Sequence, residues 1–79
     1  MDELETGKQK FLELVKDLDS AVEVVIPTTP SNSLFLISLT KGSNRKFITV
    51  PEDDILDLPI EQDIATKTAT MLKEAIGSL

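Results

Sequence analysis

Acidic side chains are the densest group of potentially reactive residues in this chain. Six of them fall within a dozen positions: Glu52, Asp53, Asp54, Asp57, Glu61 and Asp63. Carboxylates can bind Mg²⁺ or Ca²⁺. The spacing lacks the alternating acids and the central glycine of a calcium loop. We therefore expect a solvated acidic surface here and no metal site.

The residue types that most catalytic chemistry needs are missing. The sequence has no histidine, cysteine, tyrosine or tryptophan. This removes the commonest general base and metal ligand, and it removes thiol nucleophiles. Serine hydroxyls are present, but there is no histidine to activate them. We expect no enzyme activity and no cofactor.

A short basic segment, "KGSNRK", carries Lys41, Arg45 and Lys46. These cations could hold a phosphate or an acidic partner. The other interpretation is that they are solubilising charges at a turn and at strand ends, and we favour it. A phosphate loop needs several glycines leading into a helix, whereas this segment has one glycine in a hairpin.

Length and charge limit the possible classes of protein. A chain of 79 residues predicts one domain, residues 1–79, and 41% hydrophobic residues can form a core. The net charge of −6 disfavours nucleic acid and anionic membranes as partners. No apolar run approaches the roughly 20 residues of a membrane span. A soluble, cytoplasmic protein is the expectation.

Hydrophobic periodicity predicts the elements. Apolar residues recur at helical spacing over residues 2–18 and 60–76, and about one further helical turn is expected after Pro51. Alternating apolar residues predict strands over 21–27, 33–40 and 46–50. The fold class is therefore α+β: a two-layer α-β-β-β-α domain with a three-stranded antiparallel sheet and two helices on one face.

This order of elements resembles that of double-stranded RNA-binding domains at the level of the fold. That family reads RNA with a basic start to its last helix. Glu61 and Asp63 stand at the corresponding place here, ahead of Lys67. RNA binding is therefore not expected.

The loop of the second hairpin decides which side chains share a face of the sheet. An even loop places Leu39 opposite Ile48 and Ile37 opposite Val50, whereas an odd loop places Leu39 opposite Phe47. We favour the even loop because it makes one face wholly apolar. The core face would then hold Val22, Val24, Ile26, Phe35, Ile37, Leu39, Ile48 and Val50. The first hairpin would pair Val24 with Phe35.

The even loop leaves apolar side chains on the face without helices, namely Val25, Leu34, Leu36 and Phe47. We interpret these four as an interface for a protein partner or for a second copy in a homodimer. The protein would then be a small interaction or regulatory module. The competing interpretation is that residues 51–60 of the same chain cover this face.

An alternative function uses the acidic residues instead. Acids on a rigid surface could occupy a basic groove, and the protein would then be an acidic inhibitor or a nucleic-acid mimic.

Overall fold

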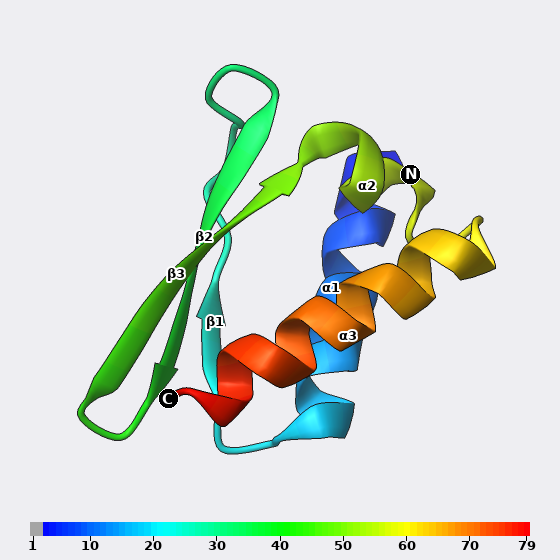
Figure 1. Ribbon diagram of the computed structural model, residues 1–79. Coiled ribbons are helices and arrows are strands. Elements are labelled where there is room, and N and C mark those ends of the chain that lie inside the picture. Colours follow the sequence, from blue (N-terminus) through cyan, green and yellow to red (C-terminus); the bar gives the residue numbers. More distant parts are fainter. Residues whose placement is uncertain (1–2) are drawn as a thin grey trace.

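The computed structural model describes residues 3–79 and shows a sheet with helices on one side of it (Figure 1). The elements are α1 (Glu3–Leu18), β1 (Glu23–Val25), β2 (Leu34–Lys41), β3 (Asn44–Pro51), α2 (Glu52–Asp57) and α3 (Gln62–Gly77). The sheet is antiparallel with the strand order β1-β2-β3. The predicted α+β class is confirmed. Position 2, where the first helix was predicted to start, lies outside the described residues.

The hydrophobic core lies between the sheet and the helices. Its buried members are Phe11, Val15, Val22, Phe35, Ile37, Leu39, Ile48, Val50, Ile55, Leu58, Leu72 and Ala75. Six of the eight residues predicted for the core face are among them, and the other two, Val24 and Ile26, are partly buried against the core. The predicted core face is therefore correct.

A two-residue turn joins β2 to β3. Lys41 pairs directly with Asn44, so Gly42 and Ser43 form the loop. Gly42 has a φ of 61°, and Ser43 is not among the residues with positive φ. Positive φ at the first central residue alone is the type II′ pattern, which suits the twist of a hairpin. The loop is even, as predicted.

The register within this hairpin differs from the predicted one. Ile37 lies opposite Ile48, and Leu39 lies opposite Lys46 instead of Ile48. Strand β2 extends one residue further than predicted, to Lys41, and β3 begins two residues earlier, at Asn44, so Ile48 pairs two residues further back along β2. The resulting slip is two residues, so every side chain stays on its predicted face.

The pairing of β1 with β2 also differs. Val24 lies opposite Leu39, not Phe35, and Val25 lies opposite Ser38. The chain forms a tight turn at Asn32 and Ser33, whose φ values of 52° and 62° fit a type I′ turn. Between this turn and β1, the segment 26–30 contains two prolines and leaves the ladder, because proline cannot donate a ladder hydrogen bond.

Helix α2 is fixed against α1 at a glycine. Gly7 is buried in α1, and a Cβ atom at that position would lie 2.0 Å from the carbonyl oxygen of Ile55. Only a residue without a side chain allows this approach. Ile55 and Leu58 are consequently buried in the helical layer, on the core side of the sheet.

Substitution of Gly7 tests this contact. We expect Gly7→Ala to lower the free energy of unfolding by about 1–3 kcal/mol, because the added methyl group forces α2 away from α1. The matched control is Gly77→Ala, where nothing lies within 4 Å of the new Cβ. Chemical denaturation would measure both. Equal stability of Gly7→Ala and wild type would contradict the close packing.

Candidate functional site

The sheet face that points away from the helices carries the four apolar residues predicted as an interface. Val25 and Phe47 flank Ser38 in one row across the three strands. Leu36 lies two residues from Ser38 along β2, on the same face. The exposed fractions are 64% for Val25, 41% for Leu34, 57% for Leu36 and 56% for Phe47. We call these four side chains the open-face cluster.

The segment 51–60 does not cover the open-face cluster. Helix α2 turns toward α1, and in Figure 1 it lies on the helical side of the sheet. Ile55 and Leu58, two apolar residues of this segment, are buried in the core instead. Among the residues that the structure describes, no element lies across Leu36 or Phe47, and both stay more than half exposed.

The open face carries little charge. Among the positions of β1, β2 and β3 that face this way, the charged ones are Glu23 and Arg45. Glu23 of β1 and Arg45 of β3 both pair with Thr40 of β2, so the acid and the base lie at opposite edges of the same row. The face is therefore close to neutral in a chain of net charge −6.

Two of the three cations of the predicted basic segment are engaged within the molecule. Lys41 Nζ donates to Asp19 Oδ2 at 2.6 Å, and Lys46 Nζ donates to Ser78 Oγ at 2.7 Å. Both lysines are on the side of the hairpin that faces the helices. These bonds tie the end of the hairpin to the loop after α1 and to the end of α3.

The six acids of the predicted acidic surface are spread over α2 and the start of α3. Asp54 Oδ2 accepts from Lys67 Nζ at 3.0 Å. Asp53, Glu61 and Asp63 are exposed, and the other three are half-buried. Within residues 3–79, no group of three or more such side chains converges as a metal site would require.

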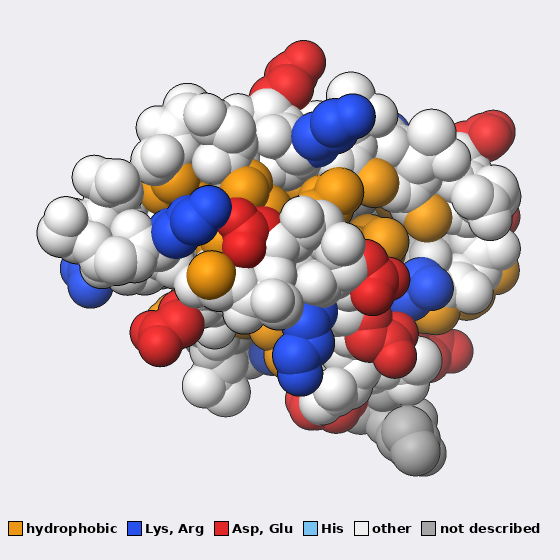
Figure 2. All heavy atoms as spheres, turned by 90° about the horizontal axis from the view of Figure 1, so that it is seen from below, with side chains coloured by type: hydrophobic (Ala, Val, Ile, Leu, Met, Phe, Trp, Pro, Cys, Tyr) orange, Lys and Arg blue, Asp and Glu red, His pale blue; other side chains and the backbone are white. Residues whose placement is uncertain are grey.

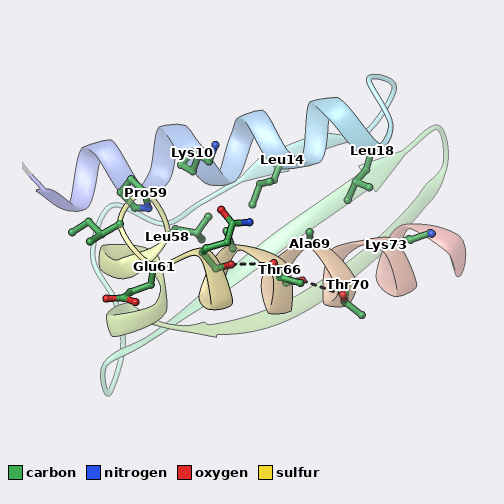
Figure 3. Close-up of a pocket in the computed structure, with 13 residues that line it drawn as sticks. Lys10, Leu14, Leu18, Leu58, Pro59, Glu61, Thr66, Ala69, Thr70 and Lys73 are labelled. Carbon is green, nitrogen blue, oxygen red and sulfur yellow. Dashed lines mark hydrogen bonds between the residues drawn. The ribbon is translucent and has the colours of Figure 1, made fainter.

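A groove between α1 and α3 was not predicted from the sequence. It has a volume of about 470 Å³. Figure 3 shows Leu14 and Leu18 reaching from α1 toward α3, where Ala65 and Ala69 form part of the opposite wall. These two alanines are four residues apart on one helix face, and this spacing was the sequence pattern that could have indicated the groove. The width of the groove depends on how far the helices diverge, which no local pattern specifies.

Hydrophobic surface is thus not confined to the open face. Seen from below Figure 1, hydrophobic side chains form a band across the molecule, bordered by lysines and acids (Figure 2). Leu12, on α1, is 37% exposed as well. Any test of the open face therefore needs an apolar control residue on the helical side.

Comparison with family models, with curated proteins and with solved structures finds no match to the chain. None of the helices within residues 3–79 is long and apolar enough to cross a membrane. The open-face cluster is consequently interpreted from its own geometry.

The contact between Lys41 and Asp19 should make the stability of the fold depend on pH. The hydrogen bond from Lys41, together with one from the backbone N–H of Ala21, holds the pKa of Asp19 below its ordinary value of 3.8. A carboxyl group of this kind stabilises the fold above its ordinary pKa, and its contribution is lost as the pH falls through the lowered value. We expect Lys41→Met to raise the pKa of Asp19, as measured by NMR titration of the carboxyl carbon.

The control for this titration is Lys16→Met, which removes a lysine near the same end of α1. It should leave the pKa of Asp19 unchanged. The difference in stability between wild type and Lys41→Met should shrink as the pH falls below 3.8. An Asp19 pKa that is identical in wild type and Lys41→Met would contradict the assignment.

Proposed function

We propose that this protein is a small interaction module that binds a protein partner through the open face of its sheet. The observation that supports the proposal is the exposure of four large apolar side chains, 41–64% each, on one face of a three-stranded sheet. Contiguous apolar surface on a small protein is typical of an interaction site. The proposed role is association and regulation, not catalysis.

The rigidity of the face favours binding. Strand β2 pairs with β3 along its whole length and with β1 at residues 38–40, and its opposite side is packed into the core through Phe35, Ile37 and Leu39. Little backbone freedom is then lost when a partner binds, which lowers the cost of association. The partner should offer apolar side chains, with polar groups opposite Ser38 and Thr40.

The expected affinity is modest. Full burial of an exposed apolar side chain of this size contributes about 1.5–3 kcal/mol. Since each member of the open-face cluster is already about half covered, roughly 1 kcal/mol each remains to be gained. Association costs about 4–15 kcal/mol, so these four residues do not hold a partner by themselves, and contacts made around them must add to the affinity.

Substitution of Leu36 tests the proposal. The wild-type protein and the variants Leu36→Lys and Leu12→Lys would each be immobilised and incubated with a lysate of the source organism. The proteins that each one binds, including further copies of this chain, would then be compared. We expect Leu36→Lys to reduce binding by about tenfold or more, because a charge is desolvated at the centre of the contact. Leu12→Lys should bind as wild type does, since it adds the same charge on the helical side.

The same experiment separates this function from the acidic inhibitor or mimic. For that function, Asp53→Asn and added salt should abolish binding while Leu36→Lys binds normally. That outcome would contradict a role for the open face. Circular dichroism would establish that each variant is folded.

A further inference from the structure

We infer that the occupant of the open face is a second copy of this chain, packed sheet to sheet about a twofold axis parallel to β2. This inference rests on the proposed function of the open face and names its partner. It comes from the order of side chains in two rows of the sheet. One row runs Glu23, Thr40, Arg45, and the next runs Val25, Ser38, Phe47.

A twofold axis that lies between two facing sheets and runs along β2 places each row of one copy opposite the same row of the other copy. It exchanges the outer strands, so β1 of one copy faces β3 of the other. Glu23 then faces Arg45 of the second copy, and Val25 faces Phe47 of the second copy. Leu36 lies on the axis and faces its own equivalent. Such aligned packing is a normal arrangement of two sheets, about 10 Å apart.

The charges select this axis over the alternative. Each copy has one acid at the β1 edge and one base at the β3 edge of the same row, so exchange of the edges forms two pairs of opposite charge. A twofold axis perpendicular to the strands would place β1 over β1 and β3 over β3, so neither Glu23 nor Arg45 could face the opposite charge. The single acid and single base of the open face are thus complementary to their own copy.

The distribution of the remaining charge also permits self-association. Residues 3–79 contain 13 acids, and Glu23 is the one on the open-face positions of the strands, so the other 12 are located elsewhere. With ordinary strand spacing and rise, β2 and β3 span roughly 10 Å by 27 Å and the three residues of β1 add roughly 5 Å by 10 Å, so the face measures about 300 Å² per copy. A standard interface takes about 800 Å² per partner, so the dimer is weak and depends on concentration.

Reversal of the two charges tests the pairing. Glu23→Arg and Arg45→Glu would be studied by sedimentation equilibrium at about 500 μM, a concentration suited to a weak interface. Wild type should approach twice the 8.7 kDa of one chain. Each variant alone should associate at least about tenfold more weakly, because like charges face each other. An equimolar mixture should recover association, because both pairs are then of opposite charge.

Matched controls separate the pairing from the change in net charge. Glu13→Arg and Lys16→Glu, both on α1, alter the net charge by the same amounts as the two test variants, and they should associate as wild type does. A mixture of the test variants that fails to recover would overturn the proposed axis. A dimer that tolerates Leu36→Lys would indicate edge-to-edge pairing of β3 and would overturn it too.

A wild-type chain that stays at 8.7 kDa at this concentration would overturn self-association. That result would leave the open face available to a different protein. The capture experiment with Leu36→Lys decides that question separately, since it detects any protein bound to the face.

Discussion

The two-residue turn between β2 and β3 is the constraint on which the surface of this protein depends. Because Lys41 pairs directly with Asn44, the alternation of side chains along both strands is fixed at the turn. One additional residue would bring Phe47 to the core and Ile48 to the open face. Gly42 allows the tight loop, since its φ of 61° costs a glycine little.

A second constraint keeps the open face uncovered. After Pro51 the chain could have continued across either side of the sheet, and its apolar residues need burial in both cases. The close approach of Gly7 to the Ile55 carbonyl fixes α2 against α1, and α3 follows on the same side. Ile55 and Leu58 of this segment therefore complete the core, and the segment leaves the open-face cluster without a cover from residues 3–79.

The sequence was sufficient to predict the faces of the sheet but not its register. Alternation of apolar residues specifies a strand only to within shifts of two, because such shifts leave each side chain on its own face. The actual pairing of Val24 with Leu39 instead of Phe35 depends on where Asn32 and Ser33 turn and on how two prolines interrupt the ladder. The groove between α1 and α3 was not predictable for a similar reason, because it depends on the angle between helices distant in sequence.

The same hairpin explains why association would use the face of the sheet and not its edge. An exposed strand edge invites pairing with another chain unless charges or proline oppose it. Strand β3 has Arg45 and Lys46 at one end and Pro51 at the other, and Lys46 is bonded to Ser78. The edge is thus unfavourable for extending the sheet at both ends. The open-face cluster, by contrast, carries no charge of its own, so contact there desolvates side chains that gain from leaving water.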